Sequence, residues 1–312
     1  MNGFNYLSVA NHESTPAANM AKKGVQIIRH SDLEPQWHVP GAKEPGFIRY
    51  LISWVGGPPD YVNPNKGHAA ISHEVVVGLM NLPIGQKQKG IHYHSVAEIY
   101  IILRGELEGY DANGHITRAG PLDCMYIPAG VPHGVRNYGV EDCDLIWVHD
   151  GIEKIGTSTY IMEGETPETP QVDEITIIPF NSLEPNYSLP RAKEIEFMRW
   201  VVNWVGGPEG FDNFNRSAAA TSDRVAIGMT VLQPAQKSVP HRLRETEVYI
   251  VLRGKVVLNL GQEKIELTKL DGAYIAAGQV HSVRNHGEDP LYLMWVHERP
   301  QPEGTAEYLG LQ

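Results

Sequence analysis

Three histidines and one glutamate have the types and spacing of metal ligands. His92 and His94 are separated by one residue, Glu98 follows on the same stretch, and His133 comes after a turn at residues 128–132. In an extended segment residues i and i+2 point to the same side, so His92 and His94 can share a face. Imidazole and carboxylate groups that converge in this number form a metal site with positions left open for water, a substrate or O2.

The segments that carry these residues have the features of short β-strands. Residues 98–107, 123–130 and 143–150 are rich in β-branched and aromatic side chains and are bounded by Gly, Pro, Asp or Asn. Their spacing of about 8–12 residues is typical of a sandwich or a jelly roll. Helical periodicity is weak, and only short pieces near the start and in the C-terminal tail are candidate helices.

The chain contains an internal repeat. Residues 42–57 read AKEPGFIRYLISWVGG and residues 192–207 read AKEIEFMRWVVNWVGG, and the match continues in EIYIILRG (98–105) and EVYIVLRG (247–254). Two long copies of one globular domain explain this better than a solenoid, whose repeats are shorter and more numerous.

The repeat predicts four segments along the chain. Residues 1–24 have no counterpart and form an N-terminal arm, residues 25–160 form an N-terminal domain, and residues 175–312 form a C-terminal domain. Residues 161–174 are acidic, Pro-rich and poor in large apolar side chains, which is typical of a linker.

Two motifs resemble the signatures of the cupin family. HYHSVAEIYIILRG (92–105) has the form H-x-H-x(3)-E-x(6)-G, and PAGVPHGVRN (128–137) has the form P-x-G-x(2)-H-x(3)-N. Only a glycine upstream of the first histidine departs from the usual pattern. The resemblance implies an all-β bicupin, with two tandem jelly-roll barrels of the double-stranded β-helix type. It also implies that His92, His94, Glu98 and His133 hold a metal inside the first barrel.

The second copy keeps only part of the ligand set. His241, Glu247 and His281 match three of the four ligands, but Leu243 stands where the first copy has His94. We expect one metal per chain, with His241 and Glu247 left as a buried hydrogen-bonded pair. The alternative is a facial triad of two histidines and one carboxylate, as in non-haem iron sites.

The repeat also separates residues that serve the fold from candidates for the site. Features kept in both copies are better explained by folding than by catalysis, which applies to the pairs Trp54 and Trp204, Trp147 and Trp295, and His149 and His297. Candidates for residues that support the ligands are Tyr93, Tyr100, Asp123 and Tyr126. Tyr100 and Tyr126 recur in the second copy, so the argument favours Tyr93 and Asp123.

Composition limits the function classes. The chain of 312 residues is 42% hydrophobic, enough for packed cores, and its net charge of −11 with no basic run argues against nucleic acid as a partner. Two cysteines cannot form a disulfide framework, so a reducing compartment is the simpler interpretation. With neither an export signal nor a membrane span in the sequence, we expect a cytoplasmic protein without a membrane partner.

The first functional hypothesis comes from the resemblance to bicupin flavonol, gentisate and diketone oxygenases. It is a dioxygenase that uses O2 on a small phenolic or enolisable substrate, with Glu98 as a ligand or as a general base. The ligand set suits Fe(II), and also Mn, Ni, Cu or Zn.

Two alternatives stay open. One is a non-oxidative isomerase, lyase or decarboxylase acting on a small sugar or acid, and the other is a binding or storage bicupin. By analogy with cupins we expect a homo-oligomer, namely a dimer.

Overall fold

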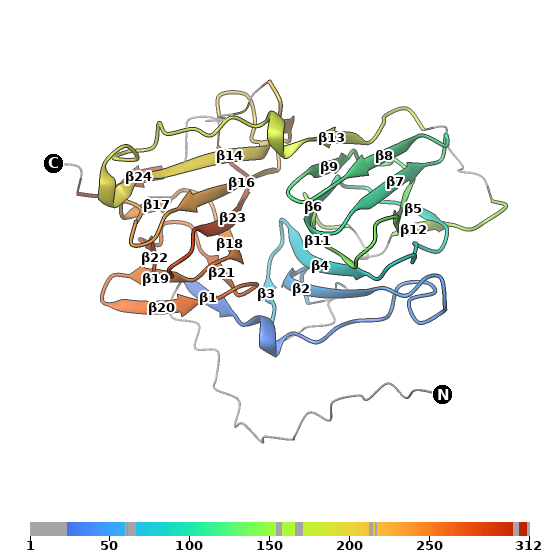
Figure 1. Cartoon of the computed structure of the whole chain (residues 1–312), viewed down its shortest axis with the longest axis horizontal. Helices are drawn as coiled ribbons and strands as arrows, with labels where there is room; N and C mark the ends of the chain where they lie inside the picture. Colours follow the sequence, from blue (N-terminus) through green and yellow to red (C-terminus); the bar gives the residue numbers. More distant parts are fainter. Residues whose placement is uncertain are drawn as a thin grey trace, which may run out of the picture.

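The computed structural model describes residues 24–59, 61, 67–153, 158–165, 171–211, 215, 217–301 and 306–310. They form two β-barrels that lie side by side, the N-terminal one on the right of Figure 1 and the C-terminal one on the left. The predicted all-β fold of two tandem jelly-roll barrels is confirmed. Of the expected N-terminal arm only Gly24 falls within the described residues.

The N-terminal barrel is built from two antiparallel sheets closed over each other. The larger sheet has the order β13-β9-β6-β11-β4-β2-β3, with only the short β3 parallel to its neighbour. Its strands are β2 (Tyr50–Gly56), β3 (Ala70–Ile71), β4 (Val76–Leu82), β6 (Glu98–Arg104), β9 (Cys124–Ile127), β11 (Cys143–His149) and β13 (Thr176–Ile178). The smaller sheet, β12-β5-β10-β7-β8, consists of β5 (Ile91–Tyr93), β7 (Leu107–Asp111), β8 (Ile116–Ala119), β10 (His133–Asn137) and β12 (Thr159–Ile161).

The C-terminal barrel repeats this plan. Its larger sheet has the order β1-β21-β18-β23-β16-β14-β15. The strands are β1 (Val25–Ile28), β14 (Arg199–Gly206), β15 (Ala220–Thr221), β16 (Val225–Leu232), β18 (Glu247–Arg253), β21 (Gly272–Ile275) and β23 (Leu291–Glu298). The opposite wall consists of β17 (His241–Leu243) paired with β24 (Ala306–Tyr308), and of β19 (Val256–Leu260), β20 (Glu263–Leu267) and β22 (Ser282–Asn285).

Helical structure in the described part of the chain is limited to three 3-10 turns. They are η1 (His30–Asp32), η2 (Phe180–Ser182) and η3 (Ile195–Phe197). Residues 1–23 at the start of the chain lie outside the described residues. At the described end of the chain Ala306–Tyr308 form the short strand β24. No helix among the described residues has the length and apolar character needed to cross a bilayer.

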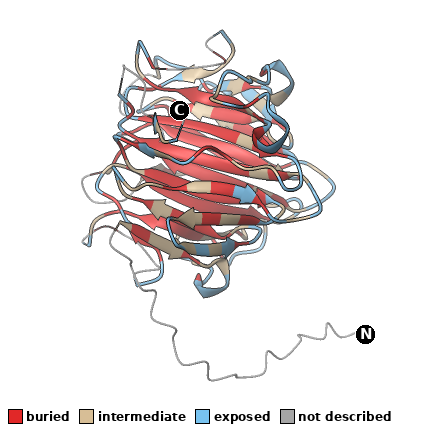
Figure 2. Ribbon diagram, turned by 90° about the vertical axis from the view of Figure 1, so that its left-hand side faces the viewer, coloured by how far each residue is buried: buried red, intermediate tan, exposed pale blue. Residues whose placement is uncertain are grey.

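The larger sheets of the two barrels pack against each other, and this explains the sequence of their central strands. Alternate residues of a strand face opposite sides, so Tyr100 and Ile102 of β6 point into their own barrel while Ile99 and Ile101 point toward the other barrel. Both faces are covered, so the strand is hydrophobic almost throughout. Strands that cross the middle of Figure 2 are buried along most of their length. The same alternation places Glu98, the first residue of β6, on the inner face.

Each barrel receives a strand from the other copy. β1 pairs with β21 of the C-terminal barrel, and β13 pairs with β9 of the N-terminal barrel. In Figure 1 the blue β1 accordingly lies among the orange strands, and the yellow-green β13 lies beside the green ones. The expected domain ranges 25–160 and 175–312 follow the repeat, but hydrogen bonding assigns the first strand of each range to the opposite sheet.

Candidate functional site

The four predicted metal ligands meet inside the N-terminal barrel. Their ligand atoms all lie within 4.8 Å of one another, and all four side chains are buried. His92 in β5 and His133 in β10 are direct neighbours in the antiparallel register. His94 follows β5 on the same face as His92, and Glu98 opens β6 in the facing sheet. The strand pairing thus brings together residues from two walls of the barrel.

Glu98 is the centre of this cluster. Its Oε2 lies 2.9 Å from Nε2 of His133, 3.0 Å from Nε2 of His94 and 3.6 Å from Nε2 of His92. Its other oxygen, Oε1, lies 3.3 Å from Nε2 of His149. One carboxylate oxygen therefore faces three imidazoles, while a fourth imidazole holds the second oxygen.

Partners on the far side of each ring aim Nε2 at the cluster. Nδ1 of His133 lies 2.9 Å from the carbonyl oxygen of Val131, which can only accept, so Nδ1 donates a proton there and Nε2 faces Glu98. Nδ1 of His94 lies 3.1 Å from Oε2 of Glu153, and the side-chain amide of Gln88 contacts Nδ1 of His92. Such outer partners are typical of histidines that bind metals.

The residues present fit a metal ion. Nε2 of His94 is fully buried and makes no hydrogen bond within the described part of the chain, although Oε2 of Glu98 is 3.0 Å away. A buried polar atom without a hydrogen bond is costly, and a cation between the imidazoles and the carboxylate would satisfy it. His92, His94, Glu98 and His133 can therefore hold a divalent transition metal with nitrogen and oxygen ligands.

The buried carboxylates of the cluster are stabilised by a positive charge beside them. Burial alone would raise the pKa of Glu98, but the charge of His94 and hydrogen bonds from His133 and His149 hold that pKa well below its usual value. Burial alone would lower the pKa of His94, but Glu98 and Glu153 raise it to about 9. Burial and the neighbouring His133 lower the pKa of His92. A proton on His94 and a metal ion at the cluster are alternative ways to neutralise the two carboxylates.

A small cavity, the N-terminal cavity, adjoins the cluster. Its volume is about 100 Å³. Besides the ligands His92, His94 and Glu98, its wall contains His38, Val39, Arg49, Leu51, Ser53, Tyr61, Met80, Gln88, Tyr100, Trp147, His149, Ser158 and Tyr160. The ring of Tyr160 stacks on His92 at 5.2 Å between centroids, and its hydroxyl lies 3.4 Å from Nη2 of Arg49. Arg49 exposes only 2% of its surface, and its Nη1 has no hydrogen-bond partner within the described residues.

Of the predicted supporting residues, only Tyr100 lines this cavity. Tyr93 does not, because consecutive residues of a strand face opposite sides and His92 takes the inner one. Asp123 instead accepts hydrogen bonds from the amides of Gly120 and Phe180, which fastens the turn before β9 to η2. Tyr126 packs against the core shared by the two barrels. None of the three lines the cavity, and Asp123 and Tyr126 instead make structural contacts.

His149 and His297 correct the argument from the repeat. Both were attributed to folding because both copies contain them, yet each contacts the central carboxylate of its own barrel. Trp147 and Trp295 likewise form cavity walls, whereas Trp54 and Trp204 are fully buried anchors between the barrels, as expected. A feature kept in both copies can therefore belong to the cluster of each barrel and not only to the fold.

Sequence reasoning missed four residues of the site. Arg49, Gln88, Glu153 and Tyr160 lie outside both motifs and reach the cluster only through the barrel closure. Arg49 and Tyr160 have counterparts in Arg199 and Tyr308 at the offset of the repeat, which was the available signal.

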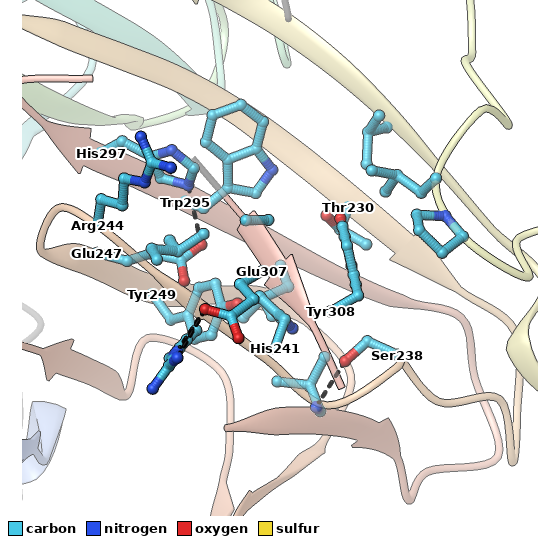
Figure 3. A pocket seen from close by; sticks show the side chains of 18 of the residues that line it. Thr230, Ser238, His241, Arg244, Glu247, Tyr249, Trp295, His297, Glu307 and Tyr308 are labelled. Atoms are coloured by element: carbon cyan, nitrogen blue, oxygen red, sulfur yellow. Dashed lines mark hydrogen bonds and ion pairs between the residues drawn. The ribbon is translucent and has the colours of Figure 1, made fainter. Parts of the chain in front are cut away.

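The incomplete cluster of the C-terminal barrel is held differently (Figure 3). Oε2 of Glu247 lies 3.1 Å from Nε2 of His281, and its Oε1 lies 3.1 Å from Nε2 of His297. His241 instead contacts the carbonyl oxygen of Val239 through Nδ1. The expected pair of His241 and Glu247 is thus replaced by hydrogen bonds that Glu247 accepts from His281 and His297. The ligand atoms of His241, Glu247 and His281 still lie within 4.8 Å of one another.

His297 brings positive charge to this second cluster. Its Nδ1 lies 3.2 Å from Oε1 of Glu245, and its Nε2 faces Glu247. Burial alone would lower the pKa of His297, but the two carboxylates raise it to about 9. Burial and His281 lower the pKa of His241 to about 4. The raised pKa that His94 has in the first barrel therefore belongs here to His297, while Leu243 occupies the position of His94.

Comparison with known proteins agrees with this architecture. A family model described as a cupin domain matches residues 78–149 and again residues 228–297. Each match contains the ligand-bearing strands of one barrel, so the predicted cupin resemblance is confirmed for both copies.

One known relative and two solved structures show what this chain is similar to. A Mycobacterium tuberculosis protein named beta-D-galactosidase Rv1717 is 27% identical over 122 residues, which is 39% of this chain and 93% of the relative. The Lactobacillus farciminis oxalate decarboxylase in its formate complex superposes with a TM-score of 0.61 at 17% identity, covering 92% of this chain and 89% of that one. Oxalate decarboxylase from Bacillus subtilis at pH 4.6 gives a TM-score of 0.58 at 16% identity, covering 94% and 81%. At such identities the structural likeness concerns the fold.

Proposed function

Since the chain is a bicupin with two cupin domains in tandem, we propose that it is a metal-dependent enzyme that acts without net oxidation on a small carboxylic acid, as a decarboxylase or lyase. The reaction takes place in the N-terminal cavity, where the complete ligand set lies. Likeness in fold to two oxalate decarboxylases supports this choice among the hypotheses from the sequence.

Arg49 is the observation that carries the proposal. Its guanidinium is buried in the wall of the N-terminal cavity, and Nη1 lacks a partner among the described residues. A guanidinium presents paired donors that match a carboxylate, and a buried cation is stable when an anion neutralises it. The M. tuberculosis relative fits a sugar substrate by its name, but a neutral sugar would leave this charge unpaired.

The size of the cavity argues for a small acid over a phenol. About 100 Å³ is the bulk volume of roughly three water molecules, whereas an engineered apolar cavity that accepts benzene measures about 150 Å³. A phenolic substrate is larger than benzene and would require the cavity wall to move. The dioxygenase predicted first from the sequence is therefore the second candidate.

The chain's own residues bind and orient the acid. Arg49 pairs with its carboxylate, and Tyr160, whose hydroxyl is next to Nη2 of Arg49, adds a donor on the same side. Burial and the nearby Glu98 raise the pKa of Tyr100 well above its usual value, so this phenol stays protonated and can give a proton to the carbon that loses CO2. His149 holds Oε1 of Glu98 and thereby directs Oε2 toward the three imidazoles.

His92, His94, Glu98 and His133 would hold the metal. When bound there, a divalent ion supplies an electrophilic centre that polarises an oxygen of the substrate. Glu98 has a low pKa and stays ionised, which suits a ligand, and the general-base role predicted for it stays a prediction.

The test compares CO2 release with O2 consumption. Protein purified anaerobically and reconstituted separately with Mn and Fe is given oxalate and other carboxylic acids of two to four carbons. We expect CO2 to form without stoichiometric loss of O2. A matched His133→Ala variant, which lacks one proposed ligand, should lose both the metal and the activity.

Other outcomes decide between the alternatives. Stoichiometric O2 consumption with a phenol or a diketone would replace the proposal with the dioxygenase hypothesis. Metal-loaded protein that binds these acids but turns over none of them would instead favour a binding role.

A further inference from the structure

The two barrels contain cavities of very different size. The cavity of the C-terminal barrel, here the C-terminal cavity, has a volume of about 1150 Å³, against about 100 Å³ in the N-terminal barrel. Nothing in the proposed reaction uses this larger space. It extends from Glu247 at the incomplete cluster to Thr230, Ser238 and Tyr308 on the surrounding wall (Figure 3).

Substitutions at matched positions explain the difference. Met80 pairs with Leu145 in the N-terminal barrel, and at the same register Thr230 pairs with Leu293 in the C-terminal barrel. By the same repeat, the positions of Leu51 and Gln88 hold Val201 and Ser238. In each case the C-terminal barrel has the smaller side chain, and all three smaller residues line its cavity. The C-terminal barrel thus lacks one of the four candidate ligands and also has the larger cavity.

Four Phe, Tyr and Trp side chains belong to the wall of the C-terminal cavity. Phe211, Tyr249, Trp295 and Tyr308 all line it. Tyr308 lies over His241 with 5.6 Å between ring centroids, as Tyr160 does over His92. Such rings bind planar apolar bodies well, because they offer a large contact area at low conformational cost.

Positive charge dominates the polar part of the wall. Arg199, Arg242 and Arg244 line the cavity, against the carboxylates of Glu247 and Glu307. Glu307 already pairs with Arg242, and Glu247 is held by His281 and His297.

Arg199 supplies the buried part of this charge. It exposes 3% of its surface, and its described hydrogen-bond partners are neutral: the carbonyl oxygens of Pro190 and Phe197 and the side chain of Tyr308. An anionic ligand would neutralise this buried cation.

We propose that the C-terminal cavity is a second binding site, which takes an aromatic carboxylate and needs no metal ion. The carboxylate lies toward Arg199, and the ring lies among Tyr249, Trp295 and Tyr308. Leu243 stands where an imidazole would complete the incomplete cluster, and Glu247 is already held by hydrogen bonds with His281 and His297. This site is independent of the reaction proposed for the N-terminal cavity.

The probe for this site is 2-naphthoate, with 2-naphthalenemethanol as the neutral analogue of the same shape. Binding is measured by titration calorimetry on the full chain, with Trp fluorescence as a second signal. We expect one naphthoate per chain and an affinity for the neutral analogue that is weaker by about tenfold or more.

Matched variants locate the binding. Thr230→Met introduces the residue that the N-terminal barrel has at this position and should weaken naphthoate binding about tenfold or more by filling the cavity. Thr221→Met makes the same change on the exposed β15 and should have no effect. If Thr230→Met does not fold, Val201→Leu makes a smaller change of the same kind. The metal content of all these variants should equal that of the wild type.

Three results would overturn the proposal. They are equal binding of naphthoate by Thr230→Met, equal binding of the neutral analogue by the wild type, and a second metal ion per chain that is lost in Glu247→Gln.

Discussion

The indole nitrogen of Trp54 donates a hydrogen bond of 2.7 Å to the carbonyl oxygen of Leu270 in the other barrel. The reciprocal bond, 2.8 Å long, joins Trp204 to Leu122. Leu122 and Leu270 both have φ of 68°, in the left-handed region that few non-glycine residues adopt. In each barrel, the carbonyl oxygen of a strained turn thus accepts a hydrogen bond from the buried tryptophan of the other barrel. Because of the repeat, this contact occurs twice.

Trp54→Phe removes this donor while keeping an aromatic ring. The carbonyl of Leu270 loses its partner, and the smaller ring leaves a void in the shared core. We expect the free energy of unfolding to fall by about 2–4 kcal/mol. Urea denaturation followed by circular dichroism measures it. Trp37→Phe, at a side chain that is 39% exposed, is the control and should cost less than about 0.5 kcal/mol.

Exchanging the residues at the matched positions 94 and 243 should change the metal content of each barrel. His94→Leu gives the N-terminal barrel the residue of the C-terminal one, and we expect its metal affinity to fall by about tenfold or more because a ligand is lost. Leu243→His restores the fourth ligand type to His241, Glu247 and His281, and we expect metal content to rise toward two per chain. Mass spectrometry of the metal, with circular dichroism as the control for folding, gives both values. Unchanged metal content in His94→Leu would contradict the proposed ligand set.

The sequence predicted the fold and the convergence of the four ligands because both depend on local patterns. Period-two alternation predicted that His92 and His94 share one face, and the resemblance of the two motifs implied that Glu98 and His133 join them. The structure places His133 beside His92 and Glu98 in the facing sheet. The loss of His94 in the second copy was likewise visible from the repeat. These features need no knowledge of how distant strands pair.

The rest depends on contacts between segments far apart in the chain. The local sequence does not indicate that β1 and β13 are exchanged between the barrels, because each strand simply begins its copy. Arg49 lies just before β2 of the larger sheet and shares a cavity wall with His92 of the smaller sheet only once the barrel is closed. The volume of each cavity depends on several substitutions acting together. His149 was misjudged because conservation between copies was equated with a folding role.

Arg49→Met should separate binding from stability. The variant removes a buried cation that has one donor without a partner, so we expect the free energy of unfolding to stay the same or rise by about 1 kcal/mol. Affinity for oxalate in the metal-loaded protein should fall about tenfold or more, because the carboxylate loses its paired donors. Calorimetry and urea denaturation give the two values. Arg49→Lys is the control that keeps the charge, and a loss of stability without a loss of affinity would argue against the anchoring role.

Asp271 bonds to Arg29 and His30, directly after the exchanged strand β1, and should make the stability of the fold depend on pH in acid. Burial alone would raise its pKa, but hydrogen bonds from the amides of Thr268 and His30 and from Arg29 outweigh burial and lower it. The folded-state pKa is therefore below the unfolded value of about 3.9. The ionised carboxylate stabilises the fold above that value, and this contribution is lost as the pH falls through the folded-state pKa.

Asp271→Asn tests this dependence. At pH 7 we expect the variant to lose about 1–3 kcal/mol of unfolding free energy. The difference in unfolding free energy between variant and wild type should narrow as the pH falls below about 4. In that range the wild type loses the same contribution. Urea denaturation at a series of pH values measures the gap. Asp223→Asn, at an exposed carboxylate, is the control, and a gap that widens in acid would refute the assignment.

Cutting the chain between the two barrels should not separate them. A protease site inserted between Gly164 and Glu165 lies in an exposed turn after β12. The N-terminal fragment keeps β1, which pairs in the sheet of the C-terminal barrel, and the C-terminal fragment keeps β13, which pairs in the N-terminal sheet. Separation would expose two sheet edges and the apolar faces of both larger sheets, which is costly. We expect the cut halves to elute together at the mass of the intact chain on size exclusion, and to part only in denaturant. Halves that separate in buffer would mean that the exchanged strands and the shared core contribute little to the association of the barrels.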